Sequence, residues 1–249
     1  MLPSIAPVVH PTTERPNPGP FDRDGLRLDR HAGAPASVEP AALVGYYRRC
    51  VRIVVVQHAE KRADGPDPGI TDRGRRQALA VRALLDGSST VTTSPMRRAR
   101  ETAAIVAGSA VPAVDTDLRE RMEWRGPSYQ PLTEFLTQWS QTTADRSFCP
   151  HQGESSLAVG LRMRNALISI ANSQAGAPAV VVTHGGATVD LLRDLLSDHV
   201  LETRAPGLLQ NGVPGAGITE SDCDGDVLTV RSIAVIDHLS PADRTGHTR

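Results

Sequence analysis

Val51-Arg52-Ile53-Val54-Val55-Val56 is the stretch on which our interpretation of the fold depends. A short β-branched run of this kind is suited to a strand that is buried on both faces, as in a parallel sheet. A second such run, Ala179-Val180-Val181-Val182-Thr183, follows much later in the chain. Both runs lead directly into a polar motif that contains a histidine, His58 in the first and His184 in the second.

Helical patterns alternate with strand patterns along the rest of the chain. This alternation predicts an α/β fold with three layers, α/β/α, around a mostly parallel central sheet. Ligands of such sheets bind at the carboxyl ends of the strands, so motifs that follow strands are the candidate site. We expect further strands at 90–93 and 113–116, a closing antiparallel pair at 218–220 and 227–236, and helices at 71–85, 97–107, 132–139, 154–172 and 187–196.

The two ends of the chain differ from its middle. Residues 1–50 are rich in proline and show no sustained helical or strand period, which is typical of a disordered arm. We assign residues 51–239 to one folded domain and expect residues 240–249 to be a frayed tail.

Charge and cysteine content argue against several classes of protein. The 27 lysines and arginines are balanced by 28 acids, so no overall field favours nucleic acid or a membrane surface. Three widely spaced cysteines without a C-x-x-C pair predict unpaired thiols rather than a zinc site or a disulfide framework. No apolar run approaches the roughly 20 residues of a membrane span, and Met1–Pro20 lacks the pattern of a signal peptide. We therefore expect a cytoplasmic protein, whose oligomeric state the sequence does not indicate.

Five polar motifs follow expected strands or open expected helices. Taken singly, a histidine after a strand or an arginine on a helix usually has a structural role, and Glu154 resembles an ordinary acid at the start of a helix. The combination is different, because two histidines and an arginine at strand ends form a compact positive pocket that suits phosphoryl transfer. The motifs are Gln57-His58-Ala59-Glu60-Lys61, Ser94-Pro95-Met96-Arg97-Arg98-Ala99-Arg100-Glu101-Thr102, Leu118-Arg119-Glu120, Gly153-Glu154-Ser155 and Thr183-His184-Gly185-Gly186.

In this order, and with Thr71-Asp72-Arg73-Gly74 after the first, the motifs resemble those of the histidine phosphatase superfamily, which contains the phosphoglycerate mutases and many small phosphatases. The family pattern is a strand ending in Arg-His-Gly or Arg-His-Ala, then Thr-x-x-Gly, Ser-Pro-x-x-Arg-Ala-x-x-Thr, Leu-x-Glu, Gly-Glu-Ser and Ser/Thr-His-Gly-Gly. The resemblance extends over about Val51–Asp237. It implies a phosphoglycerate mutase-like fold, a histidine phosphatase domain over residues 51–239, and a lid at about 122–150 that sets substrate choice.

The resemblance also implies a role for each matching residue. His58 would be the nucleophile that becomes phosphohistidine, with its other ring nitrogen held by a backbone carbonyl. Arg98 would bind phosphate oxygens, and His184 would stabilise the transferring group as an imidazolium. Glu120 would protonate the leaving oxygen and then activate water, with Glu123 as the second choice. This chemistry requires no metal and no cofactor, and its substrate would be a small phosphorylated metabolite.

Gln57 departs from the pattern, because the family has an arginine at this position. A charged hydrogen bond contributes roughly 1.5–3 kcal/mol and a neutral one roughly 0.5–1.5 kcal/mol, so glutamine in the phosphate site would cost on the order of tenfold in rate or affinity. Lys61, Arg62 and Arg97 are candidates to return a positive charge. We favour a working phosphatase, and the alternative is a weakly active or inactive relative that binds a phosphorylated ligand in a regulatory role.

The lid and the leaving group leave alternatives open. Trp124 and Tyr129 are candidates to contact the substrate, while the opposite interpretation is that the lid aromatics pack a small core of their own. Sugar, carboxylic acid and nucleotide leaving groups, and a phosphohistidine protein, all remain open as substrates.

Two other enzyme classes fit the sequence less well. A mutase is less expected, because Glu120 is followed by Arg121-Met122-Glu123 where the mutases have Arg-His-Tyr. A metal-dependent hydrolase would use His58, Glu60 and His184, but this arrangement lacks the His-Glu-x-x-His spacing that places two ligands on one helix face.

Overall fold

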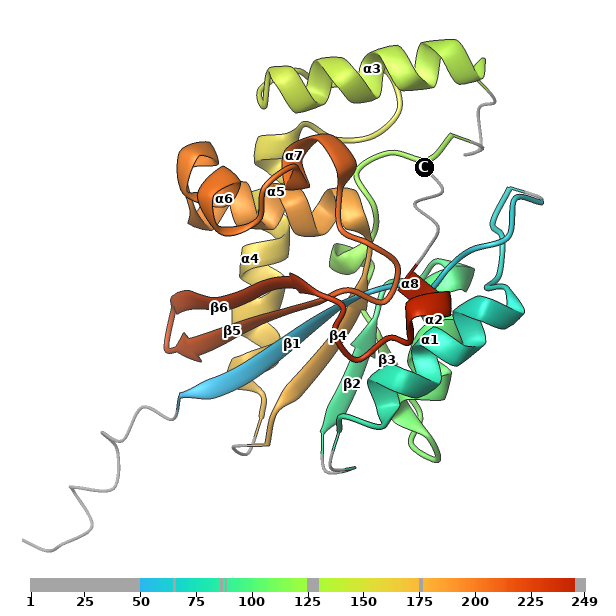
Figure 1. Cartoon of the computed structure of the whole chain (residues 1–249). Coiled ribbons are helices and arrows are strands. Elements are labelled where there is room, and N and C mark those ends of the chain that lie inside the picture. The colour runs from blue at the N-terminus through green and yellow to red at the C-terminus, as the bar shows by residue number, and fades with distance from the viewer. Residues whose placement is uncertain are drawn as a thin grey trace, which may run out of the picture. The chain divides into compact units, whose positions relative to one another are not determined.

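The computed structural model of the chain describes residues 50–64, 66–85, 87, 89–124, 130–174 and 177–244 (Figure 1). The predicted N-terminal arm, apart from Cys50, and the predicted lid residue Tyr129 lie outside these described residues. Within the described ranges, no helix combines the length and the apolar character that a membrane crossing requires.

A sheet of six strands lies at the centre, in the order β3-β2-β4-β1-β5-β6 (Figure 1). The first four strands of the chain pair in parallel, whereas β5 is antiparallel to β1 and β6 is antiparallel to β5. The prediction of a mostly parallel sheet with an antiparallel closing pair is therefore confirmed. The strands are β1 (Val51–Gln57), β2 (Thr90–Thr93), β3 (Ala113–Val114), β4 (Ala179–Thr183), β5 (Ile218–Asp224) and β6 (Val227–Val235).

Helices cover both faces of the sheet, and β1 shows why. Its side chains alternate between the two faces, and both sets are apolar. Val54 and Val56 pack into a core with residues of α1 (Asp72–Arg82) and α2 (Arg97–Ala107). Ile53 and Val55 pack into a second core with residues of α4 (Ser156–Asn172) and α5 (Gly185–Leu195). The three predicted layers are present (Figure 1).

The pairing of β1 with β4 brings the two histidine motifs together. These strands are parallel neighbours, with Gln57 opposite Thr183. The next residues, His58 and His184, therefore leave the sheet side by side at its carboxyl edge.

Side-chain caps set the start of α1 and of α4. Thr71 caps α1, because its hydroxyl accepts a hydrogen bond from the Gly74 amide. The long helix α4 begins two residues later than predicted, because Ser155 caps it by accepting from the Ala158 amide. Helix α1 ends at Arg82 rather than residue 85, and α3 (Leu132–Ala144) is longer than the predicted 132–139.

Several short elements were not expected from the sequence. They are the 3-10 helix η2 (Thr116–Leu118) and the helices α6 (Asp198–Arg204), α7 (Leu208–Asn211) and α8 (Pro241–Arg244). Helix α8 lies where we expected a frayed tail, so that prediction is wrong for its residues. The Asp243 carboxylate forms an ion pair with Arg76 of α1, and the Asp243 carbonyl accepts a hydrogen bond of 2.8 Å from the Gln77 side chain; these contacts hold the segment against the domain.

Candidate active site

His58 and His184 lie side by side at the end of β1 and β4. Their ring centroids are 5.2 Å apart and their planes are inclined by 63°. Both side chains are buried, His184 completely. Two neutral imidazoles can share such a pocket, whereas two charged ones would repel each other at this distance.

Hydrogen bonds fix the tautomer of His58. Its Nδ1 lies 2.8 Å from the carbonyl oxygen of Ala59, so the Nδ1 proton donates to that carbonyl. Nε2 is then unprotonated, and it accepts a hydrogen bond of 3.1 Å from Nε of Arg98. Burial, followed by the charge of Arg98, lowers the pKa of His58 well below its usual value. The ring is therefore neutral, with a lone pair on Nε2, which is the state a nucleophile needs.

Arg98 is a buried side chain in the first turn of α2. Its guanidinium contacts three groups, because Nε donates to His58, Nη1 donates to Oε1 of Glu123 at 3.3 Å, and Nη2 lies 3.3 Å from the sulfur of Met96. An arginine fork held this way beside an imidazole is suited to binding the oxygens of a phosphoryl group.

His184 faces the same pocket in a neutral form. Its Nε2 lies 2.7 Å from the hydroxyl of Ser94, and its buried Nδ1 has no hydrogen-bond partner among the described residues. Burial, then Arg98 and His58, lower the pKa of His184 well below its usual value. Burial and two neighbouring positive or potentially positive groups therefore oppose an imidazolium in the free protein. The imidazolium that we expect concerns the site with a bound phosphoryl group, and it stays a prediction.

Glu120 is held against the start of α5. One carboxylate oxygen accepts from the Arg121 amide at 2.8 Å and the other from the Gly186 amide at 3.0 Å. Gly186 is required for this approach, since a Cβ there would lie 2.5 Å from Oε1 of Glu120. The second candidate acid, Glu123, instead forms an ion pair with Arg98, and burial raises its pKa although Arg98 opposes the shift.

The domain that carries this arrangement matches a known protein family. A family model described as the histidine phosphatase superfamily, branch 1, matches residues 53–236. The chain belongs to the histidine phosphatase superfamily. The match contains every motif from the end of β1 to β6, so the superfamily assignment covers the whole constellation around His58 and His184.

Similar proteins of this superfamily include mutase-like proteins and phosphatases. "Phosphoglycerate mutase-like protein 4" of Arabidopsis thaliana is 35% identical over 153 residues, which are 54% of this chain and 66% of that protein. "Glucosyl-3-phosphoglycerate phosphatase" of Mycobacterium tuberculosis is 29% identical over 188 residues, which are 66% of this chain and 83% of that protein. A crystal structure of a phosphoserine phosphatase mutant from Entamoeba histolytica, in complex with phosphoserine, has a TM-score of 0.61 at 19% identity and covers 76% of this chain and 100% of that one. This last likeness shows the fold alone.

Gln57 lies at the position where the resemblance described above led us to expect an arginine. Its Nε2 is 3.4 Å from Nε2 of His58, and its Oε1 is buried without a hydrogen-bond partner among the described residues. The side chain thus points toward Nε2 of His58, but it brings no charge.

Lys61, Arg62 and Arg97 are the three nearby cations considered from the sequence, and the charge of Lys61 affects both histidines. Its charge lowers the pKa of both His58 and His184, and it also interacts with Glu120 and Glu123. Arg62 is exposed, and Arg97 is exposed and forms an ion pair with Glu101. Of these three cations, Lys61 is therefore the one that adds positive charge beside the two histidines.

Replacing Lys61 by methionine is expected to raise KM for a phosphate monoester about tenfold, because one charged contact of roughly 1.5 kcal/mol or more is lost. Steady-state kinetics measures this. Arg62→Met removes an equal charge from an exposed neighbour and should leave KM within about twofold. Equal KM values for the native protein and Lys61→Met would show that the lysine charge does not reach the phosphate.

The lid side of the site contains a buried ion pair that the sequence did not reveal. Arg121 donates to both oxygens of Asp190 on α5, at 3.0 and 3.3 Å, and its guanidinium carbon lies 4.1 Å from the ring centroid of Trp139 on α3. Ser156 donates to Asp190 at 2.7 Å. Burial raises the pKa of Asp190 to about 6, against the opposing effects of Arg121 and Ser156. The pair joins α3, α4 and α5 beside the Glu120 backbone.

Asp190→Ala is expected to lower the free energy of unfolding by about 3–5 kcal/mol, because it leaves the Arg121 guanidinium buried without its acceptor. Chemical denaturation at neutral pH, where the carboxyl is ionised, measures the loss. Asp194→Ala is the matched control, since Asp194 pairs with the partly exposed Arg164 on the same two helices. That pair should contribute less than about 1 kcal/mol. Similar losses in both variants would mean that Arg121 finds another acceptor.

The predicted lid aromatics lie in different places. The indole nitrogen of Trp124 donates to the Gln130 carbonyl at 3.2 Å, and the side chain is half-buried. Trp139 packs on Arg121, and the edge of its ring lies close to Gly186. A Cβ atom at position 186 would lie only 2.5 Å from the Trp139 ring. Trp139 is thus the described lid aromatic that reaches the Glu120 region, and the sequence did not single it out over Trp124.

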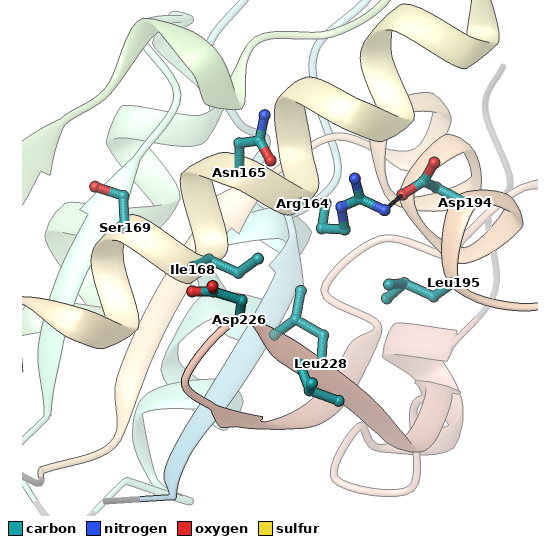
Figure 2. Close-up of a pocket in the computed structure, with 9 residues that line it drawn as sticks. Arg164, Asn165, Ile168, Ser169, Asp194, Leu195, Asp226 and Leu228 are labelled. Atoms are coloured by element: carbon teal, nitrogen blue, oxygen red, sulfur yellow. Dashed lines mark ion pairs between the residues drawn. The ribbon is translucent and has the colours of Figure 1, made fainter. Parts of the chain in front are cut away.

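Two hollows in the surface of the described residues are lined by neither His58 nor His184. One hollow, of about 610 Å³, lies between α4, the end of α5 and the β5–β6 turn, and none of the candidate site residues lines it. Figure 2 shows the side chains around it. A second, of about 310 Å³, adjoins the candidate acids. It is lined by residues 119–123 and 152–154.

Glu60 does not join the two histidines. Its carboxylate pairs with Arg73 and accepts from the Thr71 hydroxyl, so it holds the start of α1. Among the described residues, no group of three or more His, Cys, Asp or Glu side chains is placed to hold a metal ion.

Proposed function

We propose that the protein is a phosphomonoester hydrolase that acts on a small phosphorylated metabolite through a phosphohistidine on His58. The observation that carries the proposal is the unprotonated Nε2 of His58, which faces the guanidinium of Arg98 and has His184 beside it. The names of similar proteins support the reaction class, because a glucosyl-3-phosphoglycerate phosphatase is among them.

The reaction would proceed in two displacements. In the first, Nε2 of His58 attacks phosphorus, the bond to the leaving oxygen breaks, and Glu120 in its acid form donates a proton to that oxygen. In the second, Glu120 as a carboxylate takes a proton from water, the water oxygen attacks phosphorus, and the bond to Nε2 breaks. Inorganic phosphate leaves, and both the histidine and the acid return to their first state.

Side chains would supply the positive charge that phosphoryl transfer needs. Arg98 would bind two of the phosphoryl oxygens, and Lys61 would add a second charge in place of the arginine that Gln57 replaces. His184 would donate a hydrogen bond to a third oxygen, and its pKa would rise as the phosphate enters and partly offsets Arg98. We therefore propose that turnover needs no metal ion and no cofactor.

Hydrolysis of p-nitrophenyl phosphate by the purified protein tests this proposal. We expect turnover from mildly acidic to mildly basic pH, unchanged by a metal chelator and by added magnesium. Inorganic phosphate should inhibit competitively. Activity that disappears with the chelator and returns with a metal would contradict the metal-free mechanism, and absence of turnover at every pH would contradict hydrolysis of simple phosphate esters.

A second candidate function is a weakly active or inactive protein that binds a phosphorylated ligand in a regulatory role. Two observations favour it: Gln57 brings no charge to the pocket, and Arg98 already pairs with Glu123. Such a protein would bind inorganic phosphate in an Arg98-dependent manner without turning over p-nitrophenyl phosphate.

A further inference from the structure

Arg98 is engaged by an internal anion. Nη1 of its guanidinium donates to Oε1 of Glu123 at 3.3 Å, and the carboxylate of Asp67 lies 3.9 Å from the same nitrogen. The other two nitrogens contact His58 and Met96. A phosphoryl group that binds Arg98 with two oxygens must therefore compete with a carboxylate for Nη1.

The backbone that carries Glu123 is anchored on the same side of the site. Arg121 and Met122, which precede it, are both buried, and the Arg121 carbonyl accepts from the Glu154 amide at 3.1 Å. Asp67 has a different task, because its carboxylate accepts from the Arg97 amide and so caps α2. The Glu123 carboxylate has no such capping bond, so it can leave Arg98 without uncapping a helix.

We infer that the Glu123 carboxylate occupies Arg98 in the free protein and lowers the affinity of the site for phosphate monoesters. This inference rests on the proposed function, since it assumes that phosphate binds at Arg98. Like charges in a partly desolvated pocket repel strongly, and the glutamine at position 57 leaves Arg98 as the guanidinium that contacts His58. One anion in this pocket therefore weakens the binding of another.

Calorimetric binding of inorganic phosphate to the full chain tests the inference. We expect Glu123→Gln to bind phosphate about tenfold more tightly than the native protein, because the amide keeps the shape and removes the charge. Glu154→Gln is the matched control: Glu154 lines the same hollow as Glu123, but it pairs with Arg119 and Arg162 rather than with Arg98. This control should bind within about twofold of the native protein.

The pH dependence gives a second readout. The groups that face Glu123 are Arg98, Lys61, Asp67 and Glu120, and burial raises the Glu123 pKa. The ratio of the two affinities, Glu123→Gln over native, should therefore fall toward one as the pH falls and the carboxyl becomes protonated. The titration of phosphate itself cancels in this ratio.

Each result decides the inference. Tighter binding in Glu123→Gln, or binding detected in that variant alone, supports it. Equal or weaker binding overturns it, and if native binding is lost in Arg98→Ala, the phosphate site of the proposed function still stands. Absence of binding in both proteins overturns the inference together with that site. Thermal melts of all variants show that each one is folded.

Discussion

His58→Ala is expected to reduce the hydrolysis of p-nitrophenyl phosphate by about 10⁴-fold or more, because it removes the atom that forms the covalent intermediate in the proposed mechanism. The geometry around His58 explains why no neighbour replaces it. His184 is the other imidazole in the pocket, but its Nε2 already lies at hydrogen-bond distance from Ser94, and its ring follows a different strand. Steady-state rates of the two proteins at equal concentration measure the loss.

The intermediate itself provides a more direct observable. After a brief reaction with labelled substrate, the native protein should carry an acid-labile, base-stable phosphoryl group, and His58→Ala should carry none. His151→Ala is the control, because its side chain is 81% exposed and its rate should equal that of the native protein. A variant without His58 that still forms the labelled species would place the nucleophile elsewhere.

Gln57→Arg in the same assay separates the two candidate functions. A native protein that is silent while Gln57→Arg turns over would favour the phosphate-binding role. A native protein that turns over, with an increase of about tenfold in Gln57→Arg, would show a working enzyme that glutamine limits. A decrease would show a pocket adapted to glutamine, in which Lys61 already supplies the charge.

The centre of the sheet could be predicted from the sequence because β1 and β4 are apolar on both faces. Valine, isoleucine and alanine make up most of both strands, and each strand leads to a histidine. Helix packing was predicted less well. The apolar residues near the first helix are Leu79, Val81, Leu84 and Leu85; of these Val81 is fully buried, whereas Leu79 and Leu84 are 52% and 59% exposed. Besides Val81, the buried face of α1 consists of the small or polar residues Gly74, Gln77 and Ala78, because α1 packs closely on α2.

In the site, too, the sequence predicted residues within each motif better than contacts between distant segments. Motif order identified the residues that now surround His58, since each motif follows its own strand or opens its own helix. The partners of those residues come from other segments and carry no sequence signal of that kind. Arg98 with Glu123, and Arg121 with Asp190, are separated by 25 and 69 positions. Asp190 did give one clue, as an acid within an otherwise apolar stretch of helix α5.

Glu120→Gln is expected to lower kcat by about 10²–10⁴-fold, the range typical of a lost general acid or base. Two backbone amides, of Arg121 and Gly186, orient the carboxylate, so the amide variant retains the position but cannot exchange the proton. The two chemical steps should respond differently to this loss. p-Nitrophenolate is a stable anion and leaves His58-bound phosphorus without much help, whereas the attack by water still needs a base.

Rapid mixing of Glu120→Gln with p-nitrophenyl phosphate should therefore show a burst of about one p-nitrophenol per protein, followed by slow turnover. An alkyl phosphate, whose leaving oxygen must be protonated, should give no burst. Glu123→Gln is the comparison that settles the choice between the two acids, because Glu123 contacts Arg98 and lies three residues away on the same segment. If the loss of kcat and the burst appear in Glu123→Gln and are absent from Glu120→Gln, Glu123 is the proton donor, and its contact with Arg98 is a resting position of the catalytic acid.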